Sequence, residues 1–191
     1  MHSRLRLTPL LLLLLFPLRA AAAPPVDCAW PLETTGVGAT NVAYPDTDAT
    51  YWSMAFDSTT AAAMRISGEF PAARFMSFTA YDAEGGEAVA LIDEDIVPAA
   101  GSNPFTPQGA AGSGGTYTVT VVGPSGSPGA NTLVLPTSVG WVLLRVYVPD
   151  EGLDRNGGVP LPQIVLEDAD GEVRPLPLCP SNTARTARVA P

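Results

Sequence analysis

One stretch of the chain combines a cation with aromatic rings on the face of a predicted strand. Residues 141–148 alternate, and four aliphatic side chains share one face: Val142, Leu144, Val146 and Val148. The opposite face carries Trp141, Leu143, Arg145 and Tyr147. An arginine between aromatic residues pairs with a buried carboxylate, stacks on the rings, or is exposed in a binding groove. A structural and a ligand-binding interpretation therefore both stay open for Arg145.

A second arginine invites the same two interpretations. Arg74 opens the predicted strand Arg74–Tyr81, with Phe75 and Phe78 close behind it. Aromatic and arginine side chains on one sheet face could form a platform for a sugar or another polar ligand. Four residues are therefore candidates for ligand binding: Arg74, Trp141, Arg145 and Tyr147.

Carboxylates offer the remaining chemistry. Asp93, Glu94 and Asp95 form the densest acidic run and follow the predicted strand Glu87–Ile92. If the strand continued, period two would put Asp93 and Asp95 on one side, where both could bind Ca²⁺. Two carboxylates across a cleft would instead suit glycoside hydrolysis. A solvated strand end is the third interpretation. The acidic loop 150–158 resembles a calcium loop only loosely, and it also fits a wide polar loop.

Several catalytic arrangements are absent from the sequence. His2 is the only histidine, and every basic residue other than that histidine is an arginine. A chain without the first residues would lack a Ser-His-Asp or Cys-His arrangement, a Schiff-base lysine and a histidine–cysteine zinc cluster. We therefore expect no cofactor other than a calcium ion, and we favour a protein without enzymatic activity.

The first 22 residues have the order of a secretory signal peptide. Arginines come first, an apolar run from Leu10 to Leu18 follows, and small residues Ala20 to Ala23 end it. This predicts a secreted or periplasmic protein with no transmembrane segment after cleavage. Loss of three arginines would change the formal net charge from −9 to −12. Such an acidic protein is a poor partner for nucleic acid or for an anionic membrane surface.

The two cysteines lie near the ends of the predicted domain. Cys28 and Cys179 are the only cysteines, and an exported protein meets an oxidising environment. We predict an intramolecular disulfide between them, although two free thiols or an intermolecular bridge would also fit. Closing so long a loop would contribute about 5 kcal/mol in the chain-entropy model.

The elements that must position these residues are short strands. Nine segments read as strands: Tyr51–Phe56, Met64–Phe70, Arg74–Tyr81, Glu87–Ile92, Thr116–Val121, Asn131–Leu135, Trp141–Val148, Gln163–Glu167 and Glu172–Leu176. With 18 glycines and 20 prolines, long helices would be interrupted. We predict an all-β antiparallel β-sandwich or jelly roll over residues 49–179. An N-terminal arm (23–48) rich in Pro, Gly and Thr precedes it, and a disordered tail (180–191) follows. The long loops 98–115 and 123–130 read as mobile or functional.

Two segments resemble a known family. Residues 68–82 fit a G-x-aromatic-P-x-x-R-aromatic-x-S…Y-D pattern, and residues 131–149 fit an N-x-L-x-x-P…L-L-R-x-Y-x-P block. In this order they resemble bacterial envelope proteins of the domain-of-unknown-function family 1214. The resemblance covers about residues 68–153 and implies an all-β sandwich. It places Arg74, Arg145 and Tyr147 on the shared motifs and adds Tyr81 as a candidate ligand-binding residue.

The sequence favours a secreted bacterial β-sandwich protein that binds a ligand or associates with the cell envelope. The alternatives are a carboxylate-dependent glycan hydrolase and a calcium-stabilised adhesion module. Its partners are not identified by any motif, although contact with envelope components or glycans fits an aromatic face.

Overall fold

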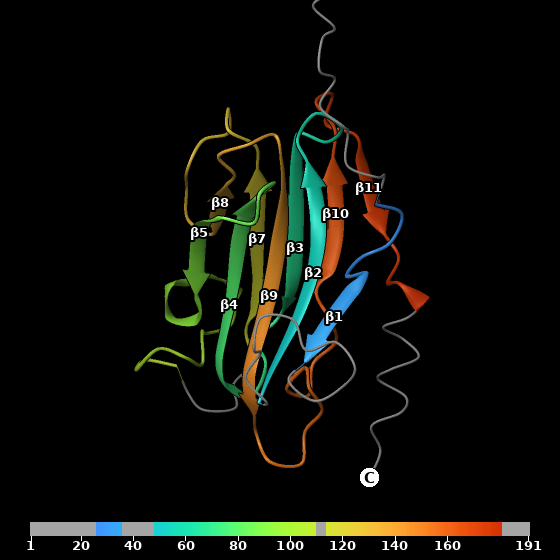
Figure 1. Ribbon diagram of the computed structural model, residues 1–191. Coiled ribbons are helices and arrows are strands. Elements are labelled where there is room, and N and C mark those ends of the chain that lie inside the picture. Colours follow the sequence, from blue (N-terminus) through green and yellow to red (C-terminus); the bar gives the residue numbers. More distant parts are fainter. Residues whose placement is uncertain (1–25, 36–47, 110–113, 181–191) are drawn as a thin grey trace, which may run out of the picture.

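The computed structural model describes residues 26–35, 48–109 and 114–180, and in these ranges nearly all of the regular secondary structure is β-strand (Figure 1). The strands are β1 (Leu32–Thr35), β2 (Ala49–Asp57), β3 (Ala63–Glu69), β4 (Ala73–Asp82), β5 (Glu87–Ile92), β6 (Pro98–Ala100), β7 (Thr116–Val122), β8 (Thr132–Val134), β9 (Val139–Pro149), β10 (Gln163–Glu167) and β11 (Val173–Leu176). One short 3₁₀ helix, η1 (Asp93–Asp95), connects β5 to β6.

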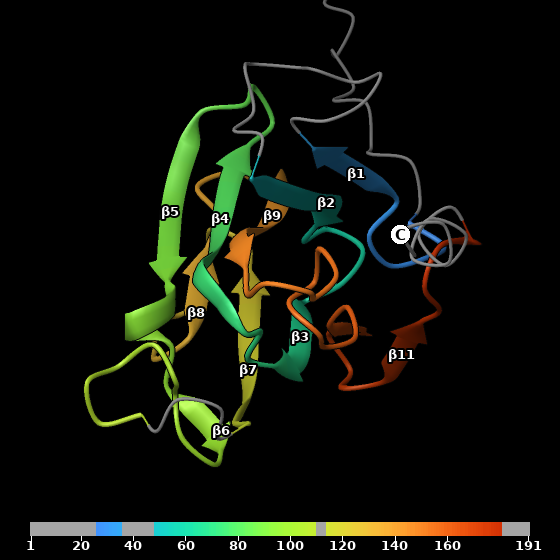
Figure 2. The ribbon, with the colours of Figure 1, turned by 90° about the horizontal axis from the view of Figure 1, so that it is seen from below.

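The strands form two sheets that face each other as two layers (Figure 2). The five-stranded sheet has the order β1-β2-β9-β4-β5, and all its pairs are antiparallel. The six-stranded sheet has the order β11-β10-β3-β7-β6, with β8 pairing in parallel with β7. The fold is an all-β sandwich, as the sequence predicted.

The core lies between the sheets and follows the alternation of the strands. Each strand turns every second side chain inward, so the apolar set of one face is removed from water. Strands β2 and β9 supply Trp52, Met54, Phe56, Val142, Leu144 and Val146, all of them buried. Phe70 and Phe78 meet the ring of Tyr117 edge-on, with centroids 5.1 and 5.6 Å away. Burial of Tyr117 raises the pKa of its phenol above the usual range.

All nine predicted strands are present, with ends that differ by a few residues at most. Tight hairpin turns connect β4 to β5 and β10 to β11. Gly85 and Gly171 have φ values of +86° and +82°, which favour glycine, and they follow Asp82 and Asp168 in the β4–β5 and β10–β11 turns.

Two short strands were missed. β1 lies inside the segment assigned to the N-terminal arm, so the sandwich begins before residue 49. β6 lies at the start of a stretch assigned to a loop. Strands of four and three residues carry too little alternation to be recognised, because only pairing with β2 and β7 defines them. Most of the arm, the predicted signal peptide and most of the tail lie outside the described residues.

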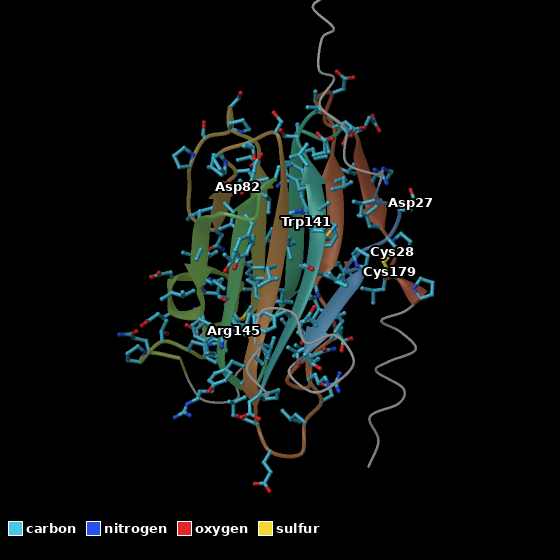
Figure 3. All side chains as sticks on the ribbon, viewed as in Figure 1. Asp27, Cys28, Asp82, Trp141, Arg145 and Cys179 are labelled. Atoms are coloured by element: carbon cyan, nitrogen blue, oxygen red, sulfur yellow. A yellow bond between two sulfur atoms is a disulfide. The ribbon has the colours of Figure 1, made fainter. Side chains whose placement is uncertain are left out.

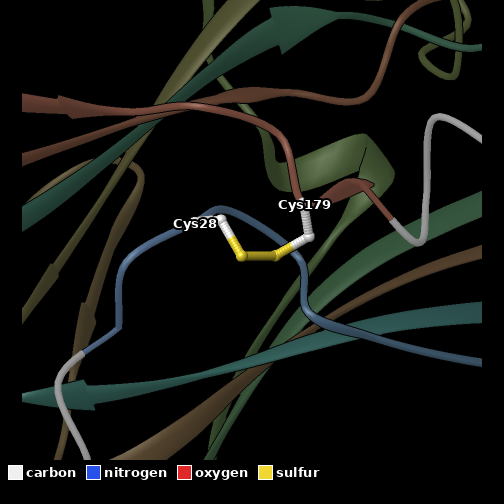
Figure 4. Close-up of a disulfide and its surroundings, with 2 residues drawn as sticks. All are labelled: Cys28 and Cys179. Atoms are coloured by element: carbon white, nitrogen blue, oxygen red, sulfur yellow. A yellow bond between two sulfur atoms is a disulfide. The ribbon is translucent and has the colours of Figure 1, made fainter.

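A disulfide joins Cys28 to Cys179, with the Cα atoms 4.9 Å apart (Figure 4). The prediction of an intramolecular bridge is confirmed. The main chain on either side is also paired, because the Ala29 amide donates to the Pro177 carbonyl and the Cys179 amide to the Ala29 carbonyl, at 2.8 and 3.1 Å. Next to the bridge, the fully buried Trp30 donates its indole N–H to the Pro162 carbonyl at 2.8 Å. The bridge therefore holds the segment that leads into β1 against the segment that follows β11.

Such a disulfide is typical of proteins in an oxidising compartment, as expected for an extracellular or periplasmic protein. Within the described ranges, no helix has the length and apolar content needed to cross a bilayer.

Candidate functional site

The outer face of the five-stranded sheet carries the largest group of aromatic side chains outside the core. Its central strand β9 turns Trp141, Leu143, Arg145 and Tyr147 outward, because Val142, Leu144 and Val146 occupy the core. The neighbouring strands turn Tyr51 on β2 and Phe75 and Tyr81 on β4 to the same side. We call this surface the aromatic face; it consists of Tyr51, Phe75, Tyr81, Trp141, Leu143, Arg145 and Tyr147.

Strand register assembles three aromatic rings around Arg145. Tyr51 stands directly opposite Arg145 across the β2–β9 pair, and Phe75 stands opposite Tyr147 across the β4–β9 pair. The Arg145 Cζ atom lies 4.9 Å from the ring centroid of Tyr147, 5.5 Å from that of Phe75 and 5.6 Å from that of Tyr51. These distances are typical of cation–π contacts, which partly replace the water lost by a guanidinium. Of the alternatives left open by the sequence, the aromatic stack is therefore the one observed.

Within the described residues, Arg145 has no anionic partner. The ion pairs in these ranges join Arg65 to Glu167 and Arg155 to Glu33, and neither involves Arg145. The Arg145 Nε atom is buried and no hydrogen-bond acceptor meets it. A buried N–H without an acceptor is unusual in folded proteins. The site therefore consists of three aromatic rings around a cation that no described residue neutralises.

Small residues of β2 and β4 flank β9 on both sides and leave room for the long outward-facing side chains of β9. Ser53 on β2 and Thr79 on β4 both lie opposite Leu143, and Ser77 lies opposite Arg145. All three hydroxyl residues are buried although they belong to an outer face. The side chains around Arg145 and Leu143 thus form a packed layer on the outside of the sheet.

The far end of the aromatic face is formed by Trp141 and Tyr81, which lie opposite each other on β9 and β4. Trp141 is 44% exposed, which is unusual for so large an apolar side chain. Figure 3 shows Trp141 and Arg145 at separate positions along the sheet. Four residues of an extended strand span about 13 Å. The face could therefore accommodate an extended ligand better than a single small ion.

Four of the five predicted ligand-binding residues are brought together on this face: Tyr81, Trp141, Arg145 and Tyr147. Arg74 is exposed and belongs to the opposite alternation of β4, because its neighbour Phe75 points to the aromatic face. The structure therefore does not bring Arg74 onto the aromatic face, and a ligand-binding role for Arg74 stays a prediction. Tyr51 and Phe75 complete the arrangement around Arg145 and were not among the predicted site residues, since strand register rather than local spacing brings them there.

The backbone is unusual at the Arg145 end of the face. Val148 directly follows Tyr147 and has a φ of +48°, a left-handed conformation that is costly for a β-branched residue. Its amide donates to the Asp48 carbonyl at 2.9 Å, which holds the end of β9 to the start of β2. Outliers of this kind cluster at functional sites, where the surrounding structure enforces them.

The expected acidic site at Asp93 and Asp95 has a different local structure. β5 ends at Ile92, and the two residues lie in η1 rather than on one side of a strand. The carboxylate of Asp93 is buried and accepts the amides of Met76 and Glu94, at 3.2 and 2.9 Å. Burial raises the pKa of this carboxyl above its usual value, while the amide hydrogen bonds oppose that shift. Asp93 is engaged in holding the chain where it leaves β5.

The Asp154 carboxylate also accepts hydrogen bonds from main-chain amides and so holds its own loop. Asp154, in the loop that loosely resembles a calcium site, accepts the amides of Asn156 and Gly158, at 3.1 and 3.0 Å. Asn103 is buried and donates to the carbonyls of Asp93 and Ile96, so part of the loop predicted to be mobile or functional is held against η1. Across residues 26–35, 48–109 and 114–180, no three acidic, histidine or cysteine side chains converge as metal ligands.

The outer face of the six-stranded sheet is polar. β7 turns Thr116, Thr118 and Thr120 outward, and the Thr118 and Ser67 hydroxyls are 3.0 Å apart. Further along, Arg65 is paired with Glu167. A shallow cleft of about 290 Å³ runs beside these residues, with Glu69, Gln163 and Pro160 in its wall. This surface has the alternation expected of an ordinary solvated sheet face.

Comparison with known proteins leaves the family open. No family model matches the chain, and no curated protein matches its sequence. The structure is similar to an uncharacterised protein of Burkholderia cenocepacia, with 18% identity and a TM-score of 0.49 over 81% of this chain and 39% of that one. A protein of Vibrio parahaemolyticus has 19% identity and a TM-score of 0.38 over 61% of this chain and 30% of that one. The chain thus spans less than half of either protein. The resemblance to family 1214 stays a prediction.

Proposed function

We propose that this chain is an exported β-sandwich module without enzymatic activity, and that it binds a ligand on the aromatic face. The observation that carries the proposal is the arrangement of Tyr51, Phe75 and Tyr147 around an Arg145 that no described carboxylate neutralises. An outward face of this composition differs from the polar surface expected of a solvated sheet.

Two further features support a binding role. The exposed Trp141 gives the opposite end of the face a flat apolar surface, and aromatic rings and arginine are the side chains most enriched at binding hot spots. The strained Val148 lies beside Tyr147. Export rests on the signal-like residues 1–22 and agrees with the disulfide. A module with these properties fits contact with glycans or other components of the cell envelope.

The hydrolase alternative has less support. Its strongest candidate is Asp93, the carboxyl with a raised pKa. A catalytic acid needs to reach a substrate oxygen, whereas both oxygens of Asp93 accept main-chain amides. We therefore favour binding over hydrolysis.

The test uses the intrinsic fluorescence of Trp141. The full chain is titrated with a panel of soluble oligosaccharides, and we expect at least one to change the tryptophan emission in a saturable way. Replacing Trp141→Phe should remove the change, because the remaining tryptophans of the described sandwich, Trp30 and Trp52, are buried. Val173→Ala is the matched control, since Val173 is an exposed apolar residue on the other sheet. If no oligosaccharide changes the emission, or if Trp141→Phe retains the change, the proposal fails.

A further inference from the structure

The guanidinium of Arg145 is chemically incomplete in the described structure. Its Nε atom is buried and no hydrogen-bond acceptor meets it, and no described residue forms an ion pair with the guanidinium. Arg65 and Arg155 show the contrast, because each of them contacts a glutamate oxygen. The three rings satisfy the faces of the cation but cannot accept its in-plane N–H groups as a carboxylate does. The guanidinium therefore lacks an anionic partner among the described residues.

The surroundings favour a ligand as the source of that anion. No acidic side chain faces outward from the strand segments around Arg145. These segments are residues 49–55 of β2, 141–147 of β9 and 75–81 of β4. Asp57 has the same alternation on β2, but it lies opposite Val139, six residues from Arg145 along β9, or about 20 Å. A negative group placed over Arg145 would meet aromatic rings and hydroxyls rather than like charge.

The planar guanidinium and the flat rings together define a chemical class. A guanidinium binds a carboxylate through two parallel hydrogen bonds, which a neutral sugar cannot provide. The rings of Tyr51, Phe75 and Tyr147 surround the guanidinium with apolar surface, and the exposed Trp141 offers a flat face to the carbon side of a sugar ring. Trp141, about 13 Å along β9, offers a further surface that a single small acid could not reach. An oligomer of acidic rings uses both ends of the face.

We infer that the ligand of the aromatic face is a glycan containing uronic acid, with one carboxylate bound to Arg145 and a more distant sugar ring of the same glycan near Trp141. This inference rests on the proposed binding function and specifies its ligand. The formal net charge, −9 for the whole chain and −12 without the three arginines of the first 22 residues, opposes the approach of an acidic polymer. At physiological salt that repulsion is screened beyond about 8 Å, so the absence of acids among the described residues around Arg145 decides the binding.

The experiment compares three ligands that differ in one group. Calorimetry measures binding of trigalacturonate, of its methyl ester and of galactotriose to the full chain at low and at moderate salt. We expect the acid to bind at least tenfold more tightly than the ester, with the difference shrinking as salt rises. Arg145→Met should abolish the difference between acid and ester. Arg145→Lys should retain part of it, because lysine keeps the charge but not the paired donors. Arg65→Met on the other sheet is the matched control.

The outcomes separate this inference from the proposed function. If galactotriose and the ester bind as well as the acid and change the Trp141 emission, the binding face stands and the uronic acid inference is overturned. Preference for the acid that survives in Arg145→Met also overturns it. If none of the three ligands binds, this inference fails, and a wider panel of oligosaccharides decides the proposed function. Urea unfolding of each variant shows whether a loss of binding is a loss of fold, and Arg145→Lys then carries the test.

Discussion

The two outer faces of the sandwich obey the same alternation and have opposite chemistry. On the six-stranded sheet, threonine and serine hydroxyls face outward and Arg65 is paired with Glu167. On the five-stranded sheet, aromatic rings face outward and Arg145 meets no described carboxylate. The first face pairs its Arg65 with Glu167 and is otherwise polar, as expected of a surface in water. The second has an unneutralised cation and exposed apolar area, which is why we assign ligand binding to it.

The two faces stay on opposite sides of the molecule only while the two sheets remain stacked. The Cys28–Cys179 bridge links the sheets, because Cys28 precedes β1 of one sheet and Cys179 follows β11 of the other. Replacing both cysteines by serine should lower the free energy of unfolding by about 2–5 kcal/mol, because the unfolded chain regains the freedom of a long loop. Urea unfolding measures the loss. Reductant should destabilise the wild-type chain and leave the double variant unchanged. Equal stability of wild-type and variant chains without reductant would show that the bridge does not hold the sheets together.

A smaller effect separates the two arginines. Arg65→Met should lower the free energy of unfolding by roughly 0.2–1 kcal/mol, and less at high salt, because its pair with Glu167 is half exposed. Arg145→Met should show no such salt dependence, since no described anion is removed from it. Urea unfolding of both variants at two salt concentrations checks this. A salt dependence for Arg145→Met as large as that for Arg65→Met would place an anionic partner elsewhere in the chain, and the contrast between the faces would be lost.

The smallest effect concerns η1, which connects β5 of the five-stranded sheet to β6 of the six-stranded sheet. Burial raises the pKa of the Asp93 carboxyl, so the folded chain holds this proton more tightly than the unfolded chain does. As the pH falls through the raised pKa toward 3.8, Asp93 should add stability, and at neutral pH this contribution is absent. When unfolding is measured from pH 7 to pH 4, the free energy of unfolding of the wild-type chain should rise relative to that of Asp93→Asn. The exposed Asp95→Asn is the control for removing a charge from the turn, and parallel curves for wild type and Asp93→Asn would contradict the prediction.

Local pattern was sufficient for most of the fold. Strands such as β2 and β9 alternate over many residues, so their inward faces could be read directly from Trp52, Met54, Val142 and Leu144. β1 and β6 could not, because their few residues acquire an extended pairing only beside β2 and β7. Asp93 shows the same limit. Its spacing from Asp95 suggested that both side chains lie on one side of a strand, but β5 ends before Asp93. The amide of Met76, 17 residues earlier, donates a hydrogen bond to the Asp93 carboxylate.

The sequence by itself determined the all-β class, the nine longer strands, the outward direction of Trp141, Arg145 and Tyr147, and the pairing of the two cysteines. These follow from period two along one strand and from the cysteine count, which need no knowledge of neighbouring strands. Only the tertiary structure decided what surrounds Arg145. Tyr51 and Phe75 lie 94 and 70 residues before it, and hydrogen-bond register across β2, β9 and β4 sets them beside its guanidinium. Register is a long-range property, because it depends on how whole strands align to bury their inner faces.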